Sequence, residues 1–297
     1  MMIPKPIKRV LLPAYLFMLY LKTAPRYKKI FYRNFLRNGG SRRSILFYPQ
    51  APNHGNAMFK VRHLLGYKVL RNPKQTADLM IHWNYGSDVQ IDESLRNMAE
   101  RGRVLNINCT NITKTHTGRV HQELFGYSLE VDPTTYTGKM VRKSNGNAAH
   151  DGVVLQGPLA DMDPAYVYQR VVKNEPLPGM AEDLRVPVVG NTIPFVYRKL
   201  RPMHMRFSAV NSSTELLEPL SVFTEEELTM IVDFCQAHGL DFGELDVLRD
   251  YDEGKIYLID VSPTPNGPPN HISDEDHVEA LRRLVMAFER EFVSQSK

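Results

Sequence analysis

The chain has 297 residues, of which 42% are hydrophobic and 24% are charged, and its formal net charge is +4. This length is enough for about two or three small packed domains, and the composition is ordinary for a globular protein. The two cysteines, Cys109 and Cys235, exclude a disulfide framework, and neither has a metal-ligand spacing with another Cys or His. We therefore expect a reducing, cytoplasmic location.

Positive charge is concentrated at the N-terminus. Residues 1–43 contain eleven Lys or Arg and no Asp or Glu, whereas the remainder of the chain has a net charge of −7. Within this basic arm, residues 11–21 (LLPAYLFMLYL) would form a helix of about 16 Å, which is too short to span a bilayer. We expect no signal peptide, because no small-residue cleavage pattern follows them.

Two interpretations of the basic arm remain open. In one, an amphipathic helix lies on an anionic membrane surface. In the other, the helix packs on the body of the protein or on a second subunit of a homodimer. A nucleic-acid-binding arm is not expected, because the basic residues are mixed with long apolar side chains and no nucleic-acid-binding motif follows.

Short apolar runs dominate the first part of the body. They alternate with helix-like stretches such as residues 93–101, which predicts a small α/β layer with a parallel sheet over residues 44–135. The runs that we expect to form its strands are residues 44–49, 66–70, 77–83 and 103–109.

The pattern changes at residue 136. From there to residue 297 the strand-like runs come closer together, and tight turns with Gly or Asn, such as SNGN and VGNT, separate them. These turns predict hairpins and therefore an antiparallel sheet. Thr224 and Glu227 form a capping box that begins one helix, and Ser273 begins the last helix.

Two of the strand-like runs each contain an aspartate among apolar residues. Asp246 and Asp260 lie in neighbouring runs that the turn at residues 250–255 joins. If both face the same way, they form a pair of carboxylates that repel one another unless a proton or a cation lies between them, and Mg²⁺ suits such a pair. The alternative is two separate ion pairs with Lys or Arg on adjacent strands.

A small polar loop between two strands lies upstream of this acidic hairpin. The stretch VRKSNGNAAHDGVV, residues 141–154, brings Lys143 to the end of one strand and places Asn145 and Gly146 in the loop. Backbone N–H groups of such a loop can approach phosphate oxygens, and Lys143 would add a positive charge. A polar hairpin tip without a ligand is the alternative interpretation.

The order of these features resembles the ATP-grasp superfamily, in which two α+β subdomains hold ATP between them. The resemblance covers residues 108–269. It implies a pre-ATP-grasp α/β domain at 44–135 and a two-subdomain ATP-grasp domain at 136–297, preceded by the basic helical arm at 1–43. The expected fold class is therefore α/β combined with α+β.

The resemblance also implies a set of ATP-binding residues. Lys114 and Lys143 match the two lysines of the family that contact phosphate. Residues 168–174 (YQRVVKN) match the hinge that contacts adenine, and Asp183 stands where relatives have a charged strand beside the triphosphate. The full set of expected nucleotide-binding residues is Lys114, Lys143, Asn145, Gly146, Gln169, Val171, Val172, Asp183 and Lys199.

Mg²⁺ is the second cofactor that the resemblance implies. Asp246 and Asp260 match the first two metal ligands of the family, and Ser262 stands at the third, where Asn is usual. Several relatives place Arg two residues before the first metal ligand, where this chain has Glu244. We expect another arginine to steady the transferred phosphate, and the candidates are Arg185, Arg206 and Arg249.

The activity that the resemblance implies is that of an ATP-dependent, ADP-forming ligase. It would activate a small-molecule carboxylate as an acyl phosphate for attack by an amine or another nucleophile. One alternative is a kinase of small molecules or sugars on the same fold. Another is a nucleotide-binding module without catalysis, which Glu244 and Ser262 leave open.

The membrane interpretation of the basic arm predicts a difference between two chain lengths. The full chain should co-sediment with anionic liposomes, whereas a truncated chain that begins at Ser44 should stay in the supernatant, because it lacks the eleven basic residues. Neutral liposomes provide the control. Equal binding of the two chains would reject this interpretation, and sedimentation of the same pair tests the homodimer.

Overall fold

The computed structural model describes residues 32, 36, 42–146, 151–208 and 211–293. Nearly all of the basic arm therefore lies outside the described residues, and its helix stays a prediction. In the part of the chain that the structure describes, no helix is both long and apolar enough to cross a membrane.

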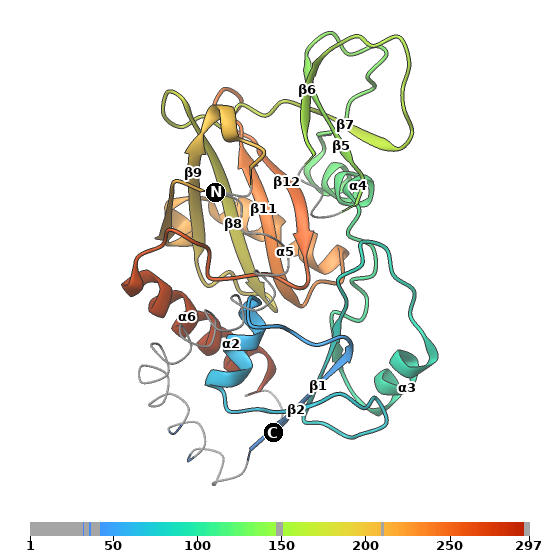
Figure 1. Ribbon diagram of the computed structural model, residues 1–297, viewed down its shortest axis with the longest axis vertical. Coiled ribbons are helices and arrows are strands. Elements are labelled where there is room, and N and C mark those ends of the chain that lie inside the picture. Colours follow the sequence, from blue (N-terminus) through green and yellow to red (C-terminus); the bar gives the residue numbers. More distant parts are fainter. Residues whose placement is uncertain (1–31, 33–35, 37–41, 147–150, 209–210, 294–297) are drawn as a thin grey trace, which may run out of the picture.

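A four-stranded parallel sheet forms the first layer, at the bottom of Figure 1. Its strand order is β2 (Lys68–Leu70), β1 (Ser44–Pro49), β3 (Leu79–Trp83) and β4 (Val104–Leu105). All five residues of β3 are buried, as expected for a parallel strand that is covered on both faces. This layer confirms the α/β prediction for the first part of the body.

Helices cover both faces of the parallel sheet. Helix α2 (Ala57–Leu64) and the last helix, α6 (Asp274–Phe292), share one hydrophobic core with Ile45 and Phe47 of β1. Helix α3 (Glu93–Arg101) packs against the opposite face through a separate cluster. The C-terminal helix thus returns to the N-terminal layer.

Two antiparallel sheets follow the parallel layer along the chain, and both confirm the predicted hairpins. The smaller sheet is at the top of Figure 1 and the larger one is in the centre. In spatial order, the smaller sheet contains β6 (Val153–Gln156), β5 (Lys139–Ser144) and β7 (Tyr166–Arg170). The larger sheet contains β10 (Ser213–Leu217), β9 (Val196–Pro202), β8 (Met180–Val189), β11 (Phe242–Arg249) and β12 (Ile256–Ser262).

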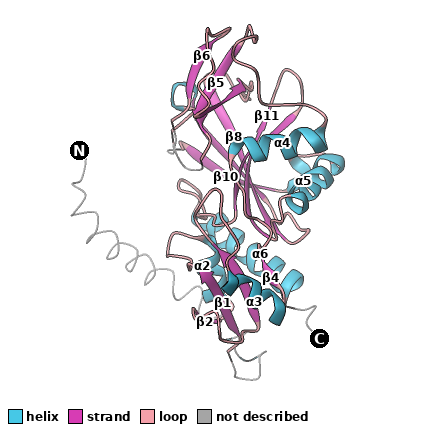
Figure 2. Cartoon of the chain, turned by 90° about the vertical axis from the view of Figure 1, so that its right-hand side faces the viewer, coloured by secondary structure: helices cyan, strands magenta, loops and turns pink. Residues whose placement is uncertain are grey.

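Alternation along β11 separates core residues from residues that face away from the core. Leu245 and Val247 belong to the core that the central sheet shares with α5 (Glu225–Ala237), whereas Glu244 and Asp246 alternate with them along the strand. Successive side chains of a strand point to opposite faces. Helices α4 (Lys114–Phe125) and α5 lie next to one another on the core side, as Figure 2 shows. On the opposite face, Phe242 packs in the core with α6, and the part around Glu244 and Asp246 is left for a polar site.

The predicted helix starts are confirmed by their caps. The Thr224 side chain accepts a hydrogen bond from the Glu227 N–H while the Glu227 side chain accepts one from the Thr224 N–H, and Ser273 caps α6. Two short 3₁₀ helices, Met203–Met205 and Pro219–Ser221, complete the described elements. The domain boundary predicted at residue 135 stays a prediction. The structure adds that α4, which precedes this boundary, packs on β12 and α5.

The packing of α6 predicts a large loss of stability when its core is truncated. Phe288 is fully buried, and its ring lies 5.9 Å from that of Phe242 and 5.1 Å from that of Phe292, between centroids. Phe288→Ala should lower the free energy of unfolding by about 3–5 kcal/mol, because it leaves a cavity. Met286 on the same helix is 51% exposed, so Met286→Ala is the control and should change it by less than about 0.5 kcal/mol. Chemical denaturation of both variants checks this; equal losses would contradict it.

Candidate functional site

A cavity of about 590 Å³ lies against the polar face of the central sheet and extends to the three-stranded sheet. The described residues that line it include seven Lys or Arg and four Asp, an excess of three positive charges. The seven cationic residues are Lys114, Lys143, Arg170, Arg185, Lys199, Arg201 and Arg206. Like charges gathered in a concave site attract a ligand of the opposite sign, so the cavity suits a polyanion.

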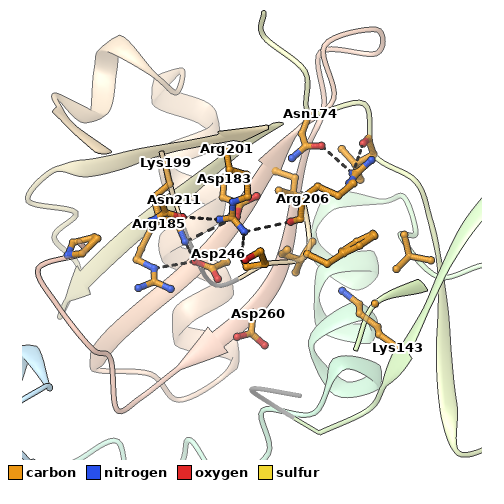
Figure 3. A pocket seen from close by; sticks show the side chains of 18 of the residues that line it. Lys143, Asn174, Asp183, Arg185, Lys199, Arg201, Arg206, Asn211, Asp246 and Asp260 are labelled. Atoms are coloured by element: carbon orange, nitrogen blue, oxygen red, sulfur yellow. Dashed lines mark hydrogen bonds and ion pairs between the residues drawn. The ribbon is translucent and has the colours of Figure 1, made fainter. Parts of the chain in front are cut away.

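Asp246 and Asp260 are directly opposite one another on β11 and β12. Both line the cavity (Figure 3). Arg185 Nε lies 3.1 Å from Asp246 Oδ1, and Lys199 Nζ lies 3.6 Å from the same oxygen. Although burial acts to raise the pKa of Asp246, these two cations hold it well below its usual range. The interpretation of an ion pair with adjacent strands therefore applies to Asp246.

Asp260 has a different environment. In the described part of the chain it has neither an ion pair nor a hydrogen bond. Burial and the nearby Asp246 carboxylate raise the pKa of Asp260 to about 6, against the opposing effect of Lys114 and Lys143. A cation between the two carboxylates would relieve this repulsion, and hard carboxylate oxygens suit Mg²⁺. Asp246 and Asp260 thus fit a divalent cation.

The two predicted phosphate lysines both line the cavity. Lys143 has no hydrogen-bond or ion-pair partner among the described residues. Burial, together with the neighbouring Lys114 ammonium, lowers the pKa of Lys143 to about 8. An anionic ligand would therefore stabilise the charged form of Lys143.

The polar loop after Lys143 is docked on the first turn of α4. Lys114 Nζ donates to the carbonyl of Gly146 at 2.5 Å, and the Asn145 carbonyl accepts from the Lys114 N–H at 3.0 Å. Asn145 Oδ1 also accepts from the Thr115 N–H. Asn145 and Gly146 are not among the lining residues, so in the structure they hold Lys114 at the edge of the cavity.

One end of the cavity is apolar and has a few polar groups. Its apolar wall is formed by Leu129, Val141, Val172, Leu248 and Ile259. Gln169 lines this end, is 3% exposed, and its amide has no hydrogen-bond partner in the described part of the chain. Val171 does not line the cavity; its N–H donates to the Lys139 carbonyl. A flat apolar group with polar edges fits this end.

Arginines connect this apolar end to the central sheet. Arg206 Nη2 donates to the carbonyl of Val172 at 3.1 Å and to Asn174 Oδ1 at 2.9 Å. Arg201 forms an ion pair with Asp183 and also donates to Asn211 Oδ1 (Figure 3). Arg201 was not predicted from the sequence. Its spacing of two residues from Lys199 on the same strand is the signal that would have identified it, because such residues share a face.

Two other predicted residues do not line the cavity. Arg249 forms a bidentate ion pair with Glu227 of α5, at 2.9 and 2.8 Å, so its guanidinium is held on the core side of the sheet. Ser262 is opposite Glu244 in the strand register, beyond the Asp246–Asp260 pair. Arg249 is therefore not retained as a candidate for phosphate contact.

No family model matches the chain, and a search of curated proteins gives no match. Solved structures do match. The ATP-grasp ligase PsnB complexed with a minimal precursor has a TM-score of 0.53 and 12% identity, over 84% of this chain and 99% of its own. D-alanine–D-alanine ligase from Bacillus anthracis complexed with ATP has a TM-score of 0.55 and 10% identity, over 85% of this chain and 98% of its own. This chain has the ATP-grasp fold.

The ATP-grasp fold confirms the predicted fold class. The cavity lies at the meeting of the two antiparallel sheets. It brings together the predicted residues Lys114, Lys143, Gln169, Val172, Asp183, Arg185, Lys199, Arg206, Asp246 and Asp260.

The raised pKa of Asp260 predicts a pH-dependent penalty on folding. The fold favours the protonated form of Asp260. Relative to a residue that does not titrate, Asp260 therefore gives its full stability below the ordinary pKa of 3.8, and this stability is lost as the pH rises through about 6. Without divalent cations, wild type should therefore lose about 2 kcal/mol relative to Asp260→Asn between pH 4 and pH 7.

Denaturant unfolding of both proteins across this pH range, in the presence of a chelator, measures the difference. Asp161→Asn removes an exposed carboxylate and is the matched control. Parallel pH profiles of wild type and Asp260→Asn would contradict the expectation.

Proposed function

We propose that this chain is an ATP-dependent ligase that activates a carboxylate as an acyl phosphate for attack by an amine or another nucleophile. The observation that carries the proposal is the cationic cavity with opposed aspartates at the meeting of two antiparallel sheets. The similar structures support it: PsnB complexed with a precursor peptide and AMPPNP has a TM-score of 0.52, and a D-alanine–D-alanine ligase is complexed with ATP.

The adenine of ATP would lie at the apolar end of the cavity. The amide of Gln169 would face the edge of the base, since Gln169 lines the cavity and its amide has no protein partner among the described residues. Buried polar groups without partners are costly, so a ligand that satisfies this amide gains specificity as well as affinity. Arg206, which already contacts the Val172 carbonyl, would hold the hinge in place around the nucleotide.

The triphosphate would extend from the hinge towards the central sheet. Lys143 and Lys114 would contact its oxygens from the side of the three-stranded sheet and α4. Asp246 and Asp260 would hold Mg²⁺, which when bound neutralises charge on the phosphate oxygens during transfer. Arg201 would keep Asp183 neutralised beside them, because the two form an ion pair.

The carboxylate substrate would enter from the end that is lined by Gly55 and residues 266–270. Its oxygen attacks the γ-phosphorus, ADP leaves, and an acyl phosphate forms. The amine then attacks the acyl carbon, loses a proton and expels phosphate. Arg185, which is fixed against Glu244 and Asp246, would stabilise the negative charge of the acyl phosphate. Positioning and charge neutralisation are the contributions that this reaction needs from the protein.

The proposal also covers the substrates and the basic arm. We propose that both substrates are small molecules and that the basic arm brings the enzyme to an anionic membrane surface or into a homodimer. The arm's charge of +11 supports the membrane version. A kinase on the same fold would transfer the phosphate to a hydroxyl instead, and the products separate these two reactions.

Nucleotide binding can be measured before the substrate is known. MgATP at about 100 times its Kd should stabilise the wild type by about 2.7 kcal/mol in thermal unfolding. Lys143→Met should weaken ATP binding about 10- to 100-fold, because a charge-assisted contact is lost. Lys139 lies on the same strand and is exposed, so Lys139→Met is the control. No stabilisation of the wild type at saturating MgATP would reject the proposal.

The reaction class follows from product analysis over pairs of carboxylates and amines. A ligase releases ADP and phosphate only when both substrates are present. Release of ADP without phosphate, with phosphate retained on an acceptor, would identify a kinase instead. Binding of ATP without ADP release for any pair, in wild type and Asp260→Asn alike, would favour the non-catalytic module.

A further inference from the structure

One carboxylate oxygen of Asp246 is already used by the protein. Arg185 Nε and Lys199 Nζ both approach Oδ1, at 3.1 and 3.6 Å. In the described part of the chain, Oδ2 has no partner. Asp246 therefore offers one oxygen to a divalent cation.

The two cations at Oδ1 are held in place by further carboxylates. Arg185 Nε also lies 3.0 Å from Glu244 Oε1, and the Glu244 side chain is only 6% exposed. Lys199 is 5% exposed, and its Nζ lies 4.0 Å from Asp183 Oδ2. Loss of the Arg185 contact would leave the buried Glu244 carboxylate without its partner. If Lys199 moved, Asp183 would keep its ion pair with Arg201.

The expected third metal ligand is not among the described residues that line the cavity. Ser262 does not line it, and Asn266, which does, accepts a hydrogen bond from Asn56 Nδ2 on its Oδ1 at 3.0 Å. Among the described residues, no group of three or more His, Cys, Asp or Glu is placed to hold a metal ion. Asp246 Oδ2 and Asp260 are described lining groups without a protein partner, and Mg²⁺ is commonly bound by one or two carboxylates plus substrate phosphates.

We infer that this site binds a single divalent cation with its nucleotide, and that Arg185 and Lys199 take the place of a second one. The inference rests on the proposed function, because it presupposes that a nucleoside triphosphate binds here. Glu244 is then a positioning residue: it holds Arg185, which comes from the neighbouring strand β8, against Asp246.

Counting bound Mn²⁺ tests this inference without a known substrate. Mn²⁺ is titrated into the full chain with saturating AMP-PNP, and free Mn²⁺ is followed by electron paramagnetic resonance, with nucleotide alone subtracted. We expect one Mn²⁺ per chain. Two would overturn the inference while leaving the proposed function intact. Failure to bind AMP-PNP at all would overturn both.

A pair of double variants tests the role of Lys199. Ser262→Asn places an Asn at the position of the family's usual third ligand. Adding Lys199→Met removes the ammonium beside Asp246 Oδ1, so this double variant should bind two Mn²⁺. The control is Ser262→Asn with Arg198→Met, which removes the neighbouring cation that pairs with Glu215 instead, and it should bind one. Equal counts for the two double variants would overturn the substitution of metal by Lys199.

Discussion

The contact of Asp246 with Arg185 and Lys199 is the interaction on which the rest of the site depends. A carboxylate on the inner face of a central strand is costly unless its charge is compensated. Here the compensation comes from the two preceding strands of the same sheet, β8 and β9. It lets β11 place one face in the hydrophobic core and the other in a charged cavity.

Elsewhere in the cavity, some buried charges lack an ion-pair partner of opposite charge among the described residues. Among the described residues, Asp260 has no cation and Lys143 has no anion within ion-pair distance. The pKa of Asp260 is raised to about 6 and that of Lys143 is lowered to about 8, so both shifts favour the neutral form. Such groups lower the stability of the empty fold. A phosphate ligand would supply the anion for Lys143, and its divalent cation would supply the positive charge for Asp260. Ligand binding should therefore also stabilise the folded protein. Sites that carry out chemistry often show this arrangement.

Contacts between distant parts of the chain form the end of the cavity that is lined by Gly55 and residues 266–270. The Ala57 N–H donates to the Pro265 carbonyl at 2.9 Å, and the Gly267 N–H donates to the Gly55 carbonyl at 3.1 Å. Lys60 Nζ also donates to the Gly267 carbonyl. These bonds tie the start of α2 to the loop after β12. Together with α6, they hold the parallel layer against the cavity entrance, where the substrate would bind.

Much of this architecture followed from local patterns in the sequence. The change from alternating strands and helices to hairpins, the capped starts of α5 and α6, and the placement of Asp246 and Asp260 on neighbouring strands depend on residues close together in the chain. The cations around the aspartates did not follow in this way. Arg249 was expected in the cavity and lies on the core side, whereas Arg201 was missed. Which arginine meets Asp246 depends on β8 lying beside β11, with Arg185 in register with Asp246. Local propensity determines where strands begin and end, but only tertiary packing decides their order in the sheet, and with it which charges meet.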